Sequence, residues 1–277
     1  MARGILSPLS ILDETAFAGV RVASPWLGVV WPALLPLRFL QVHFARDLFR
    51  LGAQAEHYAD ALGGLALSSF AALVVSIWGR SVFVRAVRLG LQSGGRVGRE
   101  ALKIPLHEIG NTLYTGLLCE VLFFLTVWLF VPIPILLLLS GLAFATAHRC
   151  ERPGLFRPLR EMVGLLANAK VGVALLFTFL IAFLVTFINL YFAFRAGLWL
   201  SGAVLGGDLA RWEHILRPGF LGVIPAEPLT FFVLVAGTML ILEPFWLAAL
   251  AVYDHRSTLR ETGEDLRLRF RQLTRTT

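Results

Sequence analysis

Three ionisable residues lie inside long apolar segments, where they could form either a functional site or a structural ion pair. They are Arg38, Glu120 and Glu243. Because a charge within a bilayer is costly, such residues by default indicate a functional site, here a carboxylate site for a proton or a cation. Glu243 is followed by Pro244, which could open the helix locally as in the broken helices of transporters. The alternative is a structural Arg–Glu pair, or protonated glutamates held by hydrogen bonds, since buried polar groups need partners in any protein.

The two glutamates lie at a similar depth in their segments. Glu120 is about ten residues and Glu243 about nine residues from the cytoplasmic end, or about 14 to 15 Å at about 1.5 Å per residue. Arg38 is about 14 residues, or about 21 Å, from its inner end and could reach either glutamate if the helices adjoin. In the structural alternative we expect Glu120→Gln and Glu243→Gln to be tolerated, because an amide replaces a protonated acid in most hydrogen bonds. In the functional alternative at least one of them abolishes function.

The histidines and cysteines form no pattern typical of catalysis or metal binding. The sequence contains no HExxH, GxSxG, phosphate-binding loop or CxxC pair. Cys119 lies in an apolar segment and Cys150 in a basic loop, which indicates neither a disulfide framework nor a metal cluster. We predict that the chain is not an enzyme and has no metal site and no cofactor. The scattered histidines are His43, His57, His107, His148, His214 and His255.

The composition indicates which elements must position the three charges. Hydrophobic residues make up 57% of the 277 residues, the mean hydropathy is +0.74, and only 16% of the residues are charged. A soluble domain carries about 25% charged residues. The apolar residues come in blocks near bilayer length, which leaves too little polar chain for a separate soluble domain. We therefore predict an all-α, polytopic membrane protein that forms a single integral membrane domain over 1–277.

Six segments have the length and apolarity of transmembrane helices. They are 24–44, 61–79, 110–130, 131–147, 171–194 and 228–252. The third and fourth are separated by the sequence VPIP, whose two prolines predict a helical hairpin rather than one overlong helix. The first segment is interrupted by Pro25, Pro32 and Pro36, which predicts a kinked or partly inserted helix.

The distribution of Lys and Arg predicts the orientation of these segments. Of the 25 basic residues, 19 lie in the N-terminus, the 80–109 and 148–170 loops and the C-terminal tail, and 5 lie in the alternating loops. Because cytoplasmic loops carry the excess of positive charge, we expect both termini to be cytoplasmic. The even number of predicted spans agrees with this orientation.

Both ends of the chain have the pattern of surface helices. Ser7 is a predicted cap and Pro8 a first-turn proline, so 1–23 should form an interfacial helix leading into the six spans of 24–252. The start lacks the pattern of a cleaved signal peptide. The basic tail, 253–277, is amphipathic and should lie on the inner leaflet.

A basic stretch follows the second predicted span on the cytoplasmic side. On one helix, the cations of 85–103 and Gln92 would form a single stripe, but Gly94 and Gly95 favour a break near 93–95 between two shorter helices. Anionic lipid headgroups attract such segments, so nucleic acid is an unnecessary partner. The predicted cytoplasmic basic face, for anionic headgroups and a protein partner, comprises Arg85, Arg88, Arg96, Arg99, Lys103, Arg157 and Arg160.

The sequence YDHRSTLRETGEDLRLRF at the end of the last span resembles the C-terminal signature of a bacterial membrane family. In these six-span proteins, related to the membrane domain of glycerophosphodiester phosphodiesterases, a span ends in Tyr-Asp-x-Arg before a Glu-Gly-Asp-Leu-like sequence. The matching positions are Tyr253, Asp254, Arg256, Gly263, Asp265 and Leu266. Thr262 separates Glu261 from Gly263, a departure from the pattern. The resemblance implies a noncatalytic membrane domain in the bacterial inner membrane. From the residues alone, Tyr253 suits the membrane interface, and Asp254 could pair with Arg256.

Two functional hypotheses from different classes follow. The first is a noncatalytic inner-membrane scaffold or subunit of a membrane complex, with a protein partner or further copies of itself. The second is a proton- or cation-coupled transporter or channel-like protein that uses Glu120 and Glu243. The short polar loops favour the first, because they leave no evident gate or nucleotide site.

Overall fold

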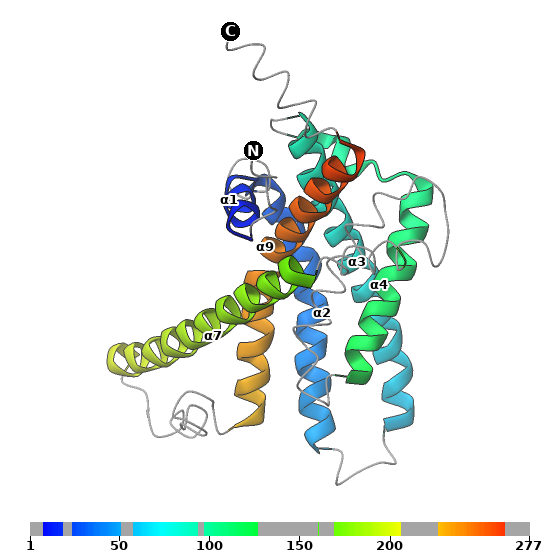
Figure 1. The fold of residues 1–277 in the computed structure, drawn as a ribbon. Coiled ribbons are helices and arrows are strands. Elements are labelled where there is room, and N and C mark those ends of the chain that lie inside the picture. Colours follow the sequence, from blue (N-terminus) through cyan, green and yellow to red (C-terminus); the bar gives the residue numbers. More distant parts are fainter. Residues whose placement is uncertain are drawn as a thin grey trace. The chain divides into compact units, whose positions relative to one another are not determined.

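The described part of the chain is entirely helical. The computed structural model describes residues 8–18, 24–50, 58–93, 97–126, 160, 169–205 and 227–263, and no strand occurs among them (Figure 1). The helices are α1 (Pro8–Ala18), α2 (Ser24–Arg50), α3 (Tyr58–Ser93), the 3-10 helix η3 (Arg99–Leu102), α4 (Leu106–Thr126), α7 (Ala169–Leu205) and α9 (Pro228–Thr262). The predicted all-α fold is therefore confirmed for these residues.

Three helices are long and apolar enough to cross a membrane, which indicates a membrane-embedded protein. Their apolar stretches are Ser69–Ser93 in α3, Val171–Val204 in α7 and Leu229–Arg260 in α9. The first and third predicted spans coincide with α2 and most of α4, whereas 131–147 lies outside the described residues. The full set of six spans stays a prediction.

The chain divides into two compact units, each assembled from distant segments. The first unit comprises Met1–Val30, Ile77–Thr178 and Pro244–Thr277. The second comprises Trp31–Ser76 and Phe179–Glu243. Because the unit boundaries fall inside α2, α3, α7 and α9, the units are not consecutive domains along the sequence.

In the first unit, two helices contain stretches that are buried on every face. In α3, the six consecutive residues 79–84 are all buried. Among them, Val82, Phe83 and Val84 are at most 1% exposed. In α9, every residue from Trp246 to Asp254 is buried. A helix that is covered all round belongs to the interior of a multi-helix assembly, not to its surface.

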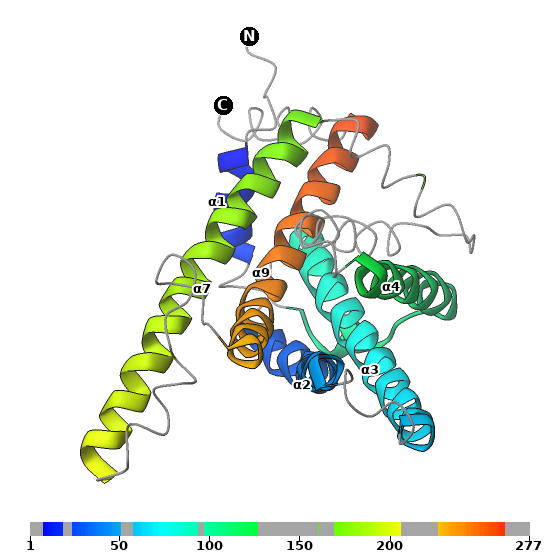
Figure 2. The ribbon, with the colours of Figure 1, turned by 90° about the horizontal axis from the view of Figure 1, so that it is seen from below.

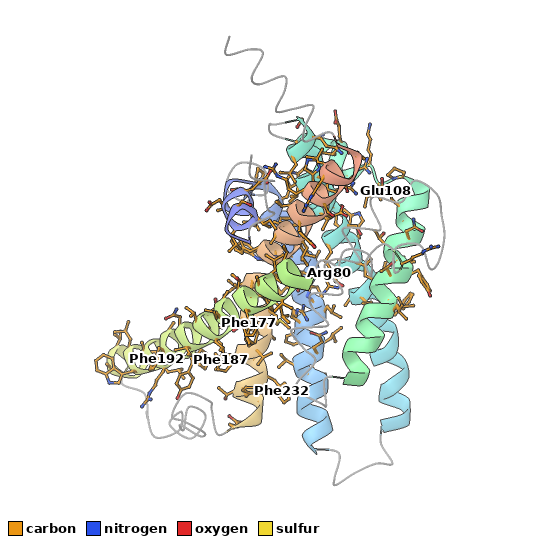
Figure 3. All side chains as sticks on the ribbon, viewed as in Figure 1. Arg80, Glu108, Phe177, Phe187, Phe192 and Phe232 are labelled. Carbon is orange, nitrogen blue, oxygen red and sulfur yellow. The ribbon has the colours of Figure 1, made fainter. Side chains whose placement is uncertain are left out.

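In the second unit, α7 packs against α9 through large side chains. Phe187, Tyr191 and Leu234 form its buried core. The ring centroids of Phe187 and Phe231 lie 5.8 Å apart in an edge-to-face arrangement, a geometry that aromatic pairs favour. Figure 3 shows the side chains along this pair of helices, with Phe187 and Phe232 labelled. A Cβ at Gly237 would lie 3.0 Å from the Leu190 Cδ2 atom, so the absent side chain lets the helices approach closely.

The basic stretch 85–103, which begins inside α3, is not one continuous helix. α3 ends at Ser93, Val97 and Gly98 are not helical, and the chain resumes only as the four-residue η3. The alternative of an uninterrupted helix from 85 to 103 is therefore wrong, and the second segment is shorter than predicted. Residues 94–96 lie outside the described part.

The last helix is longer than the predicted span. α9 continues from Pro228 to Thr262, well beyond the predicted end at residue 252 (Figure 2). Its end is set by Gly263, whose φ of 69° is a left-handed conformation that glycine adopts without steric cost. The backbone N–H of Gly263 donates to the Arg260 carbonyl at 3.3 Å, which closes the last turn.

Candidate functional site

A buried ion pair joins α2 to α9 within the second unit. Arg38 donates a hydrogen bond from Nη2 to Oε2 of Glu243, and each side chain is only 6% exposed. The second guanidinium nitrogen, Nη1, donates to Oε1 of Gln41 at 2.7 Å. The sequence prediction that Arg38 could reach a glutamate is thus confirmed for Glu243.

The pairing changes what a substitution at Glu243 should do. The carboxylate faces a guanidinium, which is always charged in proteins, so it acts as a counter-ion and not as a neutral hydrogen-bonding acid. A glutamine would keep one acceptor but remove the negative charge. The tolerance expected for Glu243→Gln from the sequence rested on a protonated carboxyl, and this geometry argues against it.

Prolines lie beside both members of the pair. Pro36 precedes Arg38 by two residues, and Pro244 directly follows Glu243. Each proline lacks a backbone N–H and so removes one helical hydrogen bond. Both helices nevertheless continue through these positions, as do the helical residues around Pro32. The first predicted segment therefore lies in a continuous helix of 27 residues, and its kink or partial insertion stays a prediction.

The structure does not describe the side chain of the second glutamate that was predicted to lie within the membrane. Glu120 lies in α4, in the first unit, and its side chain lies outside the described residues. The predicted site shared by Glu120 and Glu243 therefore stays a prediction.

The predicted basic face separates into paired and exposed cations. Arg85 donates from Nη1 to Oε2 of Glu108 at 2.6 Å, and Arg88 is half-buried and also takes part in an interaction. Arg99 and Lys103 are exposed. Of the remaining predicted members, Arg160 is exposed, and Arg96 and Arg157 lie outside the described residues.

Buried polar side chains gather in the first unit on three helices. Sequence reasoning did not single out this cluster, although the α4 members recur at helical spacing on one face. Figure 3 labels Arg80 of α3 and Glu108 at the start of α4. Each member is at most 9% exposed: Arg80, Ser81, Glu108, Asn111, Thr112, Thr115, Asp254 and Ser257. Such a concentration of buried polar groups is typical of membrane helices that turn their polar sides inward.

The residues of the C-terminal signature have distinct positions in α9. Tyr253 is 1% exposed, so its side chain is buried within the protein, and its position at the membrane interface stays a prediction. Asp254 is completely buried, whereas the Arg256 side chain is 49% exposed. Residues two apart on a helix do not face each other, and the Nε of Arg256 instead donates to Oε2 of Glu14 in α1 at 2.6 Å. This partner was missed from the sequence. Asp265 and Leu266 lie outside the described residues.

Metal-binding groups and surface depressions are the other features of the described residues that could mark a site. Among the described residues, no group of three or more His, Cys, Asp or Glu side chains could hold a metal ion. A shallow depression on the surface of α7 is lined by Phe192, Arg195, Ala196 and Trp199.

Comparison with known proteins adds no relative to these observations. No family model, curated protein or solved structure matches the chain. The functional argument therefore has to come from the geometry of the described residues.

Proposed function

We propose that the chain is a noncatalytic scaffold or subunit of a membrane complex in the bacterial inner membrane, with both termini in the cytoplasm. Its cytoplasmic basic face holds anionic lipids and a protein partner. The observation that carries this proposal is the buried pair between Arg38 and Glu243.

The pair supports a structural role because its charges neutralise each other. With each side chain 6% exposed, the carboxylate has the guanidinium as its partner and has little contact with the surroundings. A buried ion pair fixes the register of two helices, since sliding either helix would leave an uncompensated charge. One exposed cation of α9, Arg256, is also paired within the protein, with the half-buried Glu14 of α1.

The experiment is recovery of the protein from native membranes in a mild detergent, followed by native mass spectrometry. We expect a partner chain, or further copies of this chain, in a fixed ratio. Arg38→Glu and Glu243→Arg should each lose the complex, and the double charge reversal should recover part of it. A protein that is recovered alone and monomeric, with all variants alike, would contradict the proposal.

A proton- or cation-coupled transporter is the second candidate, and one feature favours it. The Nε atom of Arg38 is buried and has no hydrogen-bond partner among the described residues. Pro244, which follows Glu243 in the sequence, also removes one helical hydrogen bond. A polar site with unused hydrogen-bonding capacity at this depth could take a second anionic or polar group.

The transporter hypothesis is tested with the purified protein in vesicles that contain a pH-sensitive dye. Transport predicts proton flux that is lost in Glu120→Gln or Glu243→Gln while the fold and assembly survive. Absence of flux in the parent protein under both pH and cation gradients would reject it. Arg195→Gln, at an exposed position of α7, serves as the matched control.

A further inference from the structure

The two faces of α4 have the reverse of the polarity that a soluble helix shows. Its buried face carries polar side chains, and its exposed face carries large apolar ones. The buried polar residues are Glu108, Asn111, Thr112 and Thr115, each at most 9% exposed. The exposed apolar residues are Ile109, Leu113 and Leu117, each at least 38% exposed.

This reversal indicates what surrounds the outer face of α4. In water, a helix turns its apolar stripe inward and its polar side outward. In lipid, polar groups must find partners inside the protein, and apolar side chains face the hydrocarbon. Glu108 has such a partner in Arg85. Ile109, Leu113 and Leu117 follow one another at intervals of four residues and form one continuous lipid-facing stripe.

The short segment before α4 places two exposed cations beside an exposed leucine. Ala101 of η3 is completely buried and attaches the segment to the protein. Leu102 is 41% exposed, and its neighbours Arg99 and Lys103 are also exposed. Within the described part of the chain, neither cation has a side-chain hydrogen bond or ion pair. The exposed Glu100 is the segment's one anion.

We propose that residues 99–103 form a seat for an anionic phospholipid of the inner leaflet. Leu102 enters the acyl-chain boundary above the apolar stripe of α4, and Arg99 and Lys103 bind the phosphate of the headgroup. Long basic side chains suit this position because their methylene stems lie along apolar surface while the charge reaches the headgroups. Arg85 takes no part, since Glu108 already neutralises it.

The test is photocrosslinking from position 102 in purified full-length protein, in vesicles of equal parts phosphatidylglycerol and phosphatidylcholine. A photoreactive analogue replaces Leu102, and mass spectrometry measures the ratio of the two lipid adducts. We expect mainly phosphatidylglycerol adducts. Removing one cation, in Arg99→Gln or Lys103→Gln, should lower the ratio about fivefold, and the double variant about thirtyfold.

Two controls separate this seat from general attraction to a basic protein. Arg260→Gln, at an exposed cation of α9, should leave the ratio at position 102 unchanged. A photoreactive analogue at Leu113 should capture both lipids with a ratio near one in every variant. Adducts of water or protein at position 102, or an unchanged ratio in the double variant, would overturn the proposal. So would a ratio that falls when free inorganic phosphate is added at constant ionic strength, because a soluble anion would then be the ligand.

This inference rests on the proposed function, which assigns the basic face to anionic lipids. The experiment on the lipid seat can nevertheless fail while the experiment on the scaffold succeeds, and the reverse. The scaffold is tested by partner recovery from native membranes, whereas the lipid seat is tested on the purified chain. Loss of the lipid signal with the complex intact counts against the seat alone. An intact lipid signal without any partner counts against the scaffold alone.

Discussion

Removing the negative charge of Glu243 should destabilise the protein by about 3 kcal/mol. In Glu243→Gln, Arg38 would remain charged at 5% exposure without its counter-ion. Breaking a buried pair costs about 3 to 5 kcal/mol, and an arginine at the centre of a membrane helix costs about 2.5 to 3.5 kcal/mol. The value near 3 kcal/mol applies because Nη1 keeps its 2.7 Å hydrogen bond to Gln41. This change lowers the ratio of folded to unfolded protein by about two orders of magnitude.

Substituting Arg38 as well as Glu243 shows whether the loss of stability comes from the ion pair itself. Arg38→Gln should cost a similar free energy, because it removes the guanidinium from beside the buried Glu243 carboxylate. The double variant, Arg38→Gln with Glu243→Gln, places two neutral amides opposite each other and should cost less than either single change. We therefore expect a coupling free energy of at least about 3 kcal/mol in a double-mutant cycle.

The assay is equilibrium unfolding in mixed micelles, followed by circular dichroism and tryptophan fluorescence. Arg195→Gln is the matched control, because it removes an exposed cation of the second unit and should change stability by less than about 0.5 kcal/mol. If the effects of the two single changes add within about 0.5 kcal/mol, the reasoning from the ion pair is refuted.

Three further predictions concern helix packing, a helix end and the orientation. Gly237→Val should destabilise the protein by about 1 to 3 kcal/mol, because the new β carbon would lie 3.0 Å from a leucine methyl group. Gly172→Ala should be neutral or slightly stabilising, because nothing lies within 4 Å of the added β carbon. Thermal unfolding of the two variants tests both expectations. Gly263→Ala should cost about 1 to 2 kcal/mol in the same assay, since alanine is strained at a φ of 69°, and an unchanged midpoint would refute this. Cysteines at Val97 and Leu155 should be inaccessible to membrane-impermeant reagents added to intact cells, and labelling of either from outside would overturn the orientation.

The sequence predicted the helical class and gave a buried Arg–Glu pair as one alternative, because both depend on local or strongly constrained properties. In a bilayer, long apolar segments can form all their backbone hydrogen bonds only as helices or closed barrels. The length of these segments favours helices. Arg38 had few candidate partners, since acidic residues inside apolar segments are rare. The choice of Glu243 required the helix arrangement, which no local pattern contains.

The ion pairs of Arg85 and Arg256 were not predictable in the same way. Arg85 and Arg256 belong to patterns that identify a charged face, but a pattern along one helix does not identify a partner on another. Their partners, Glu108 and Glu14, are among many acidic residues in the polar segments. The burial of Tyr253 was not predictable for a related reason, because the complete burial of α9 around it depends on neighbouring helices.

The unequal burial of the apolar helices has a consequence for biogenesis. Only 28% of the most apolar part of α7 is buried, compared with 61% for α3. α7 can therefore partition from the translocon into lipid on its own hydrophobicity. α3 carries the buried Arg80, which is costly in lipid until neighbouring helices surround it. We expect the order of stable membrane integration to differ from the order of synthesis, with the earlier helix α3 retained beside the translocon until its later partners arrive.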